Sequence, residues 1–357
     1  MATMRDKESG ARSDPSTHFF FDRLAEYREI VLDRMTRLVP SRGRYRHSLY
    51  DPMLDYPLRE GKGFRPALLL SMCQACGGSL GHALDTAVAL EMFHNAFLIH
   101  DDSEDGSYTR RGAPTLHVQH GVAIATNIGD ALNMLALTTL LGNTGLIGLE
   151  RSLVVIEEVA RMARETTEGQ SIELDWVAGR RVPAGLRDYL LMTYKKTTWY
   201  TCIAPMRLGA LIADVPPANL TGLVALGFRI GAAFQIQDDI LNLIGEEALY
   251  GKERNGDVAE GKRTLMIIHA MTGHEPERRR LLEAIYAKPR AEKTDEDIAM
   301  VLDAIHRTES IDYARAVAGR LAESAKRLFD RRFDWIPAGP HRRFIEEMIH
   351  YMITRPL

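Results

Sequence analysis

Residues 87–105 read AVALEMFHNAFLIHDDSED, an apolar stretch that ends in an acidic cluster. A helix places Asp101 and Asp105 on one face about one turn apart, because they are four residues apart. Two like charges at this spacing destabilise a helix by about 0.2–0.5 kcal/mol. We therefore predict a compensating cation. Oxygen ligands without a nearby cysteine or paired histidine favour Mg²⁺.

A second acidic cluster closes another apolar stretch, where residues 234–242 read FQIQDDILN. Asp238 and Asn242 would share a helical face. A lone Asp-Asp pair at a helix end is usually a surface or capping feature, but two such pairs that end two buried helices seldom arise by chance. Inward-facing carboxylates on opposed helices build metal sites in helical bundles. The two clusters therefore predict a metal site between helices.

The spacing of apolar residues predicts an all-α fold. Over 19–38 an apolar side chain returns every three or four positions, and no stretch of the chain alternates with period two for long. Further helices are predicted over 65–76, 82–103, 116–141, 150–179, 184–213, 218–245 and 264–271, with more towards the C-terminus. Glycine and proline mark the breaks, as at Gly77-Gly78. We expect a helical bundle.

Composition bounds the domain organisation and the partners. The chain has 45 Lys and Arg residues against 48 Asp and Glu, a formal charge of −3 without the basic excess of a nucleic-acid-binding protein. Its hydrophobic (45%) and charged (26%) fractions are those of a globular protein with a sizeable core. Residues 1–17 are polar and lack an apolar period, so we expect a disordered tail before a single domain over 18–357.

One uncharged stretch, between Asp130 and Glu150, is just long enough to span a membrane. Its GNTG sequence at 142–145 indicates a break between two buried helices, so we predict no membrane span. Three cysteines are too few for a disulfide framework, and Cys73 and Cys76 lack the further ligands of a zinc site. The N-terminus does not resemble a signal peptide. The low cysteine count and this N-terminus together favour a location in the reducing cytoplasm.

Basic residues accompany both acidic clusters. Arg110 and Arg111 follow the first cluster, and Lys262 follows the second. The others open helical segments or lie just beyond the second cluster: Lys62, Arg65, Lys195, Lys196 and Lys252. Each alone is usually a solvated surface residue. Beside two carboxylate clusters, such cations are the groups that hold phosphates.

Five motifs occur in a fixed order: GKGFRP (61–66), DDSED with RRGAPT (101–115), GQSIELD (169–175), KT (196–197) and FQIQDDILN with GKRT (234–264). Each is weakly specific alone, but in this order they resemble a trans-isoprenyl diphosphate synthase of the polyprenyl synthetase family. The resemblance implies an all-α bundle of the isoprenoid synthase type around a deep central cavity. It also implies a homodimer, with the two aspartate-rich motifs facing across the cavity mouth.

The resemblance assigns a role to each matching residue. Asp101 and Asp105 would bind Mg²⁺ that bridges an allylic diphosphate, and Asp238 would bind a further Mg²⁺. Asp102 and Asp239 would be outer ligands. The residues implied to contact the allylic diphosphate are Arg110, Lys196, Lys252 and, close by, Lys262. Those implied to hold the diphosphate of isopentenyl diphosphate are Lys62, Arg65, His94 and Arg111. Those near the developing allylic cation would be Thr197 and Gln235.

Five positions in these motifs, or close to them, need comment. A lone histidine on an apolar helix is more often a core residue, and only the position of His94, seven residues before Asp101, favours a site role. Asn242 stands where many members have a third aspartate, so it keeps an oxygen donor but loses a charge. Gly63-Phe64 replaces a more usual Arg-Leu, which removes one cation. Glu173 replaces an aspartate in the Gly-Gln motif.

The implied activity is the head-to-tail condensation of isopentenyl diphosphate with dimethylallyl, geranyl or farnesyl diphosphate to an all-trans prenyl diphosphate. Ala96 and Phe97 lie about one turn before Asp101, where the growing apolar tail would meet them. Because Ala96 is small and only Phe97 is bulky, we expect a product longer than C15 and favour geranylgeranyl diphosphate (C20). A C15 product and products of C25 or longer are the alternatives.

Other kinds of protein also carry acidic helix ends. A class I terpene cyclase would need an Asn/Asp, Ser/Thr, Glu triad at four-residue spacing, which Asp238, Asn242 and Glu246 do not supply cleanly. A squalene- or phytoene-type synthase would have a different acidic pattern. An inactive regulatory subunit would be expected to have damaged acidic motifs, whereas both motifs here are nearly complete. Turnover by the protein alone separates these alternatives.

Overall fold

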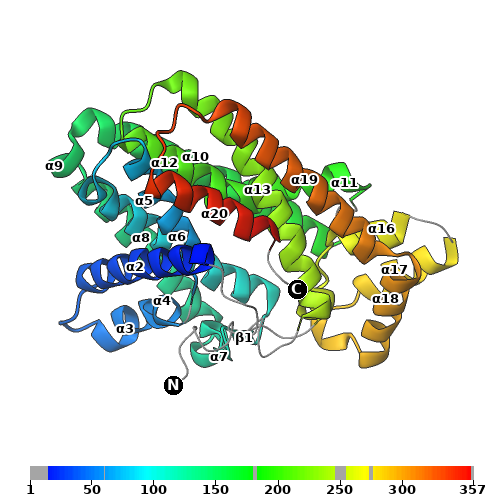
Figure 1. Cartoon of the computed structure of the whole chain (residues 1–357). Coiled ribbons are helices and arrows are strands. Elements are labelled where there is room, and N and C mark those ends of the chain that lie inside the picture. The colour runs from blue at the N-terminus through cyan, green and yellow to red at the C-terminus, as the bar shows by residue number, and fades with distance from the viewer. Residues whose placement is uncertain (1–14, 60, 180–182, 246–254, 273–275, 355–357) are drawn as a thin grey trace.

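The fold is a bundle of long helices (Figure 1). The computed structural model describes residues 15–59, 61–179, 183–245, 255–272 and 276–354. Its α-helices are α2 (Pro15–Leu38), α3 (Asp51–Met53), α4 (Asp55–Leu58), α5 (Phe64–Ala75), α6 (Leu80–Asp105), α7 (Leu116–His120), α8 (Val122–Gly142), α9 (Thr144–Ile147), α10 (Leu149–Val177), α11 (Leu186–Thr193), α12 (Ala204–Ile212), α13 (Pro217–Ile244), α15 (Gly256–Glu260), α16 (Leu265–Thr272), α17 (Pro276–Tyr286), α18 (Asp295–Arg307), α19 (Ser310–Arg332) and α20 (Pro340–Thr354).

Three further kinds of element, all of them short, occur in the described residues. They are the π-helices η1 (Arg46–Tyr50) and η2 (Tyr194–Ile203), the 3₁₀-helix η3 (Arg290–Glu292) and the antiparallel strands β1 (Thr109–Arg110) and β2 (Ala113–Pro114). Because this two-residue hairpin is the sole sheet in the described part of the chain, the predicted all-α fold is confirmed.

The helix boundaries differ from the predicted ones in three places. α2 begins at Pro15, so the last residues assigned to the tail are helical, while residues 1–14 lie outside the described part. The single helix predicted over 116–141 is wrong, because Gly121 adopts a φ of 85° and separates α7 from α8. The stretch 184–213 is not one regular α-helix, because it changes to the π-helix η2 in its middle.

Helix α6 ends where its acidic cluster ends. The side chain of Ser79 accepts a hydrogen bond from the backbone N–H of His82 and caps the N-terminus. Gly106 terminates the helix in the left-handed conformation, with a φ of 67°. The cluster therefore occupies the last turn, where the negative end of the helix dipole opposes further negative charge. This placement increases the need for nearby cations.

Two hydrophobic clusters meet along α13. The larger cluster is built mainly on α2, α5, α6, α8, α12 and α20, and includes Leu226 and Ile230 of α13. The smaller one lies among α16–α19 at one end of the molecule (Figure 1) and includes Ile236 and Ile240 of the same helix. The second acidic motif therefore lies on the part of α13 that packs in the smaller cluster.

The π-helix η2 is held between α10 and α13 at close range. A Cβ built on Gly169 of α10 would lie 2.1 Å from the backbone nitrogen of Lys196. A Cβ on Gly231 of α13 would lie 2.9 Å from the side chain of Thr198. Both glycines are required because any side chain would push the helices apart. These two close contacts fix the position of Lys196 and Thr197 between α10 and α13.

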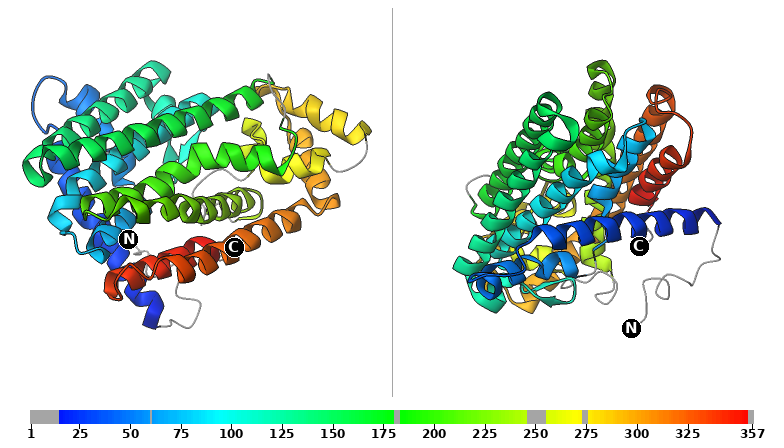
Figure 2. Two further views of the ribbon diagram at one scale, coloured as in Figure 1. Left: turned by 90° about the horizontal axis from the view of Figure 1, so that it is seen from above. Right: turned by 90° about the vertical axis from the view of Figure 1, so that its left-hand side faces the viewer.

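Two segments, Val122–Ile147 and Pro217–Ile244, are long and apolar enough to cross a membrane by composition alone. The core helix of a globular protein passes the same test, and half of the best window in the second segment is buried inside the bundle. In the first segment α8 ends at Gly142 and α9 begins at Thr144, but the predicted break between two buried helices is not found as such, because Asn143 between them has helical backbone angles and α9 has no buried residue. α8 and α10 lie along an outer side of the bundle (Figure 2).

Candidate active site

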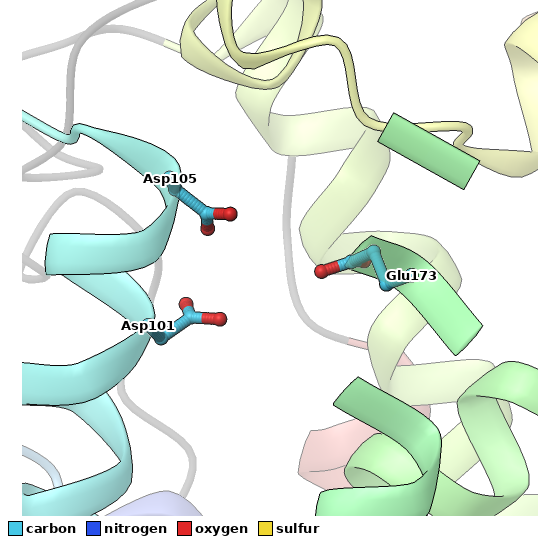
Figure 3. Close-up of side chains that lie close together, drawn as sticks. All are labelled: Asp101, Asp105 and Glu173. Carbon is cyan, nitrogen blue, oxygen red and sulfur yellow. The ribbon is translucent and has the colours of Figure 1, made fainter. Parts of the chain in front are cut away.

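Three carboxylates converge at the end of α6. Asp101 and Asp105 project from the same face of this helix, as their spacing predicted, and point towards Glu173 of α10 (Figure 3). One oxygen from each lies within 4.8 Å of the other two. Asp105 and Glu173 are the more buried members, with side chains 4% and 8% exposed. Three carboxylates at this distance can carry their negative charge only with positive charge beside them.

Two lysines supply that charge. The ammonium group of Lys196 donates to Asp101 Oδ1 at 2.9 Å and also to Glu173. Lys262 Nζ lies 2.7 Å from Asp105 Oδ2. Both lysines come from segments remote from α6 in sequence. Their ion pairs therefore connect the acidic end of α6 to η2 and to the residues after α15.

The lysines act unequally on the two aspartates of α6. Burial acts to raise the pKa of Asp101, but the charges of Lys196 and Lys262 hold it well below its usual range. Burial raises the pKa of Asp105 to about 8, and the neighbouring charge of Asp101 adds to this rise. In this arrangement the pair shares its negative charge unequally, as two close carboxylates do.

Asp102 faces a different set of partners. It is fully buried, accepts a hydrogen bond from the Tyr56 hydroxyl at 2.6 Å, and forms a two-pronged ion pair with the guanidinium of Arg110. Arg110 is itself 7% exposed. Asp102 therefore anchors Arg110 beside the acidic site, and its role as an outer ligand stays a prediction.

The second acidic motif forms its own network. The buried carboxylate of Asp239 accepts hydrogen bonds from Tyr189 and Gln235, both at 2.7 Å. Gln235 Oε1 in turn accepts from Thr197 at 3.1 Å, which joins two residues predicted to lie near the allylic cation. Burial, reinforced by the charge of Asp257, raises the pKa of Asp239 to about 8.

The two other predicted positions of the second acidic motif, Asp238 and Asn242, differ in burial. Asp238 is half-buried and lies outside the close set of three acids at α6, so its metal role remains a prediction. Asn242 is buried, and its Oδ1 accepts the backbone N–H of Asp257 at 3.1 Å. Its carbonyl accepts the N–H of Asn255 at 3.0 Å. The amide that replaces the third aspartate thus holds the start of α15.

A separate cationic cluster lies around Arg65. One guanidinium nitrogen lies 3.3 Å from His94 Nε2, another donates to Thr201 at 2.9 Å, and the group stacks over the ring of Tyr200. The Arg65 Nε and the His94 Nδ1 are buried, and neither has a hydrogen-bond partner within the described structure. Because Arg65 donates to Nε2, Nδ1 carries the proton of the neutral ring. Two adjacent donors are therefore left without an acceptor.

Lys62 and Arg111 are each held by contacts of their own. Lys62 Nζ donates to the Tyr351 hydroxyl of α20 at 2.6 Å. Arg111 adopts a left-handed φ of 51° in the hairpin turn and donates to the carbonyl of Tyr56 at 2.8 Å. Its guanidinium lies against Gly61, where a Cβ would come within 2.8 Å. Burial lowers the pKa of Arg111, and the nearby cation of Arg65 contributes to this.

The two residues predicted to limit chain length differ in exposure. Ala96 is fully buried in the larger hydrophobic cluster, whereas Phe97 is only half-buried. The Phe97 ring lies 6.2 Å from that of Phe93 and 5.8 Å from that of Tyr200. Phe97 lies one helical turn before Asp101. Its neighbour Tyr200 is also the ring over which Arg65 stacks.

Sequence reasoning missed several residues of the site. Glu173 was noted only as a variant of the Gly-Gln motif, although its i, i+3 spacing from Gln170 indicates a shared face. Gln170 confirms that face, because its amide donates to Asp101 at 3.2 Å. Tyr56, Tyr189 and Tyr200 carried no signal, since each contacts a residue far away in sequence. The predicted Lys252 lies outside the described residues.

The acidic end of α6 fits a hard divalent cation. Its three donors are all carboxylates, and two ammonium groups already occupy the positions of positive charge around them. Oxygen-only donor sets of this kind suit Mg²⁺ rather than softer metals. Asp101, Asp105 and Glu173 are the residues that could hold it.

Comparison with known proteins agrees with this site. The sequence model of the polyprenyl synthetase family matches residues 47–305. The short chain isoprenyl diphosphate synthase of Methanothermobacter thermautotrophicus is 33% identical over 260 residues, which cover 72% of this chain and 76% of that protein. The geranylgeranyl diphosphate synthase of Methanosarcina mazei is 32% identical over 297 residues, covering 83% and 86%. The geranylfarnesyl diphosphate synthase of Natronomonas pharaonis is 29% identical over 350 residues, covering 93% and 96%.

Solved structures share the fold. The geranylgeranyl pyrophosphate synthetase from Pyrococcus horikoshii matches with a TM-score of 0.83 and 28% identity, over 95% of this chain and 99% of that one. The geranylgeranyl pyrophosphate synthase from Corynebacterium glutamicum, solved with isoprenyl diphosphate and magnesium, gives 0.83 and 26%, over 93% and 99%. Fold and site together define an all-α prenyltransferase. The chain belongs to the polyprenyl synthetase family and is a trans-isoprenyl diphosphate synthase, as its motifs predicted.

The neutral state of His94 gives a test of the cationic cluster. Burial, together with the charges of Arg65 and Arg111, lowers the His94 pKa well below 6.5. The unfolded chain takes up a proton near pH 6.5 while native His94 does not, so stability falls as the pH falls through that value. Compared with His94→Gln, the wild type should lose about 1 kcal/mol more unfolding free energy between about pH 7 and pH 5.5. Urea unfolding at both pH values measures this, and equal losses in the two proteins would contradict it.

Proposed function

We propose that this enzyme condenses isopentenyl diphosphate with allylic diphosphates and makes geranylgeranyl diphosphate. One observation supports a reaction with two diphosphate substrates, namely that the described residues form two separate groups of charged side chains, each of which could serve one diphosphate. The first is the carboxylate set at α6 with its lysines, which suits a diphosphate held through a metal. The second is the cluster of Arg65 and His94, in which Arg65 Nε and His94 Nδ1 are buried and have no acceptor among the described residues. A reaction with a single diphosphate substrate would not explain why Arg65 and His94 form a second cluster of buried donors.

The first group would take the allylic diphosphate. Asp101 and Asp105, with Glu173 beside them, would hold Mg²⁺ there, and Asp238 would hold a further Mg²⁺ from α13. Bound Mg²⁺ would neutralise charge on the diphosphate oxygens. Lys196 and Lys262 already stand at the carboxylates, so their ammonium groups can turn to the diphosphate when the metal takes those oxygens.

The same diphosphate would meet further cations. Arg110, fixed by Asp102, would contribute its guanidinium, and Lys252 belongs to this proposed set from its place in the motif alone. Pre-placed positive charge of this kind stabilises a leaving group as its negative charge develops. Thr197 and Gln235, joined by a hydrogen bond, would present oxygen atoms to the allylic cation left behind.

The second group would take isopentenyl diphosphate. Arg65 and His94 would donate through Arg65 Nε and His94 Nδ1, and Lys62 and Arg111 would add further positive charge. The C–O bond to diphosphate would break first, and the double bond of isopentenyl diphosphate would then attack the allylic cation. The new C–C bond leaves a tertiary cation, which loses a proton to the released diphosphate. No dedicated protein base is therefore needed.

The experiment that tests this function is incubation of the purified protein with labelled isopentenyl diphosphate and Mg²⁺. Dimethylallyl, geranyl and farnesyl diphosphate are offered separately, and the dephosphorylated products are sized by chromatography. A ladder that ends at C20 supports the proposal. An end at C15, or at C25 as in the name of the Natronomonas pharaonis relative, keeps the chemistry and rejects the C20 product. Absence of incorporation with every primer favours a cyclase or an inactive subunit.

Loss of either acidic motif should abolish most of the activity. Asp101→Ala and Asp238→Ala should each reduce turnover by roughly 100-fold or more, because they remove charge that would hold Mg²⁺ on the leaving diphosphate. Asp303→Ala, at an exposed aspartate of α18 paired with Arg307, is the matched control and should keep wild-type turnover. Near-wild-type turnover in both motif variants would reject the site assignment.

Chain length should depend on Phe97. Its half-buried ring lies one turn below Asp101, where a prenyl tail that starts at the diphosphate would run into it. Phe97→Ala should therefore shift the product towards C25 and longer in the same assay. Leu191→Ala, at an exposed residue of α11, is the control and should leave the product unchanged. An unchanged product from Phe97→Ala would mean that another residue forms the floor of the tail site.

We also propose that two copies associate through α8, α9 and α10. This side of the bundle carries an unusual number of exposed apolar side chains, among them Met134, Leu141, Leu149 and Leu153, each more than half exposed. α8 contains a single charged residue, Asp130. A face with few charges is complementary to itself, which suits a two-fold dimer of identical copies. We propose that each copy in this dimer folds as a single domain over residues 18–357, after the N-terminal tail. We also propose that the dimer is cytoplasmic.

The dimer is tested by placing charge on this face. Leu141→Glu combined with Leu153→Glu should convert the protein to a monomer, because two copies would then bury four uncompensated carboxylates. Light scattering coupled to gel filtration measures the mass. Met300→Glu, at a similarly exposed residue of α18, should remain dimeric. A wild-type monomer, or a double variant that stays dimeric, would contradict the proposed interface.

A further inference from the structure

Glu260, the last residue of α15, is a buried carboxylate that contacts Ser107, Arg290 and Lys262. Its side chain is 8% exposed. Glu260 Oε1 accepts hydrogen bonds from the Ser107 hydroxyl at 2.6 Å and from Arg290 at 2.9 Å. Its Oε2 lies 3.1 Å from Lys262 Nζ. Both carboxylate oxygens are therefore engaged, each on a different side.

These contacts join three segments around the acidic site. Ser107 follows the end of α6, Arg290 belongs to η3, and Lys262 follows α15. Arg290 also stacks over the ring of Tyr108, at 4.6 Å from its centre. Burying a carboxylate is costly unless cations and donors compensate it, and here Arg290 and Lys262 do so. None of the steps proposed for the reaction requires this carboxylate.

Its position relative to Lys262 shows what it can do. The Lys262 ammonium lies between two carboxylates, 2.7 Å from Asp105 and 3.1 Å from Glu260. Only Asp105 belongs to the set that would hold a metal. A metal that takes Asp105 must displace the ammonium from it, so a second carboxylate that retains the ammonium lowers the cost of that displacement. Lys262 and Glu260 line one polar pocket together with Arg110, Asn242 and Asp257.

We propose that Glu260 is a positioning residue that retains Lys262 beside the pocket and so releases Asp105 to the metal. Asp105 is the closer of the two carboxylates that contact Lys262 and would be the one that remains without the charge of Glu260, so Lys262 would compete with Mg²⁺ for it. This role rests on the proposed function, because it assumes that Asp105 binds Mg²⁺ and that Lys262 serves the diphosphate. It adds a residue that touches neither the metal nor the reacting atoms.

The variant that tests this role is Glu260→Gln, which keeps the size and an acceptor oxygen but removes the charge. Calorimetric titration of Mg²⁺ in the presence of inorganic pyrophosphate, together with the Mg²⁺ dependence of turnover, measures the effect. The Mg²⁺ concentration for half-saturation should rise at least about fivefold, the lower end of typical coupling between sites. The KM for isopentenyl diphosphate should stay as in the wild type. Ser107→Ala removes a hydrogen bond without changing charge and should leave the Mg²⁺ half-saturation unaltered.

A second pair of variants separates the proposed route from a general loss of negative charge. In a Lys262→Gln background the competitor is gone, so adding Glu260→Gln should not raise the Mg²⁺ half-saturation further. A further rise of the same size in that background would overturn the proposal, as would an unchanged half-saturation in Glu260→Gln alone. If Glu260→Gln does not fold, Glu260→Asp, with its shorter reach, should raise the value by a smaller factor, and no rise would again overturn it.

Failure of this proposal and failure of the proposed function give different results. A wild type that binds Mg²⁺ and pyrophosphate but incorporates no isopentenyl diphosphate would contradict the proposed reaction. The calorimetric comparison of Glu260→Gln with the wild type would still report on Lys262. A wild type that makes prenyl products while Glu260→Gln keeps wild-type Mg²⁺ affinity would contradict only the role of Glu260.

Discussion

The site depends on charge compensation at the C-terminal end of α6. Asp101 and Asp105 stand on one face of its last turn, at the negative end of the helix dipole, with Glu173 facing them. Such a group of buried carboxylates is stable only if cations reach it. Lys196, 95 residues beyond Asp101, and Lys262 provide them. The same contacts that stabilise the folded chain place two ammonium groups where a diphosphate would need them.

Close helix packing makes this compensation possible. Gly169 lets α10 approach the backbone of η2, and Gly231 lets α13 approach it from the other side. The π-helix between them carries both Lys196, which contacts the first acidic motif, and Thr197, which is linked through Gln235 to the second. Wider helix turns of this type often occur at functional sites, and here the irregular segment lies between the two motifs.

Much of the site was accessible from sequence because its signals are local. The shared face of Asp101 and Asp105 follows from four-residue spacing, and the structure has that face. The partners of these residues were not accessible. Tyr56 holds Asp102 and Tyr189 holds Asp239, yet neither tyrosine belongs to a motif or a period. Contacts between distant segments depend on how the helices pack, which no local pattern encodes.

The sequence by itself determined the all-α class, most helix positions, the acidic ends of α6 and α13 and the order of the basic motifs, because these follow from helical periodicity and from turn residues. Only the tertiary structure decided the break at Gly121, the π-helix η2, the place of Glu173 in the acidic set and the two contacts of Lys262. These features are set by competition among packing, backbone strain and charge between segments that are far apart in the chain. Such a competition is resolved only when the whole bundle assembles.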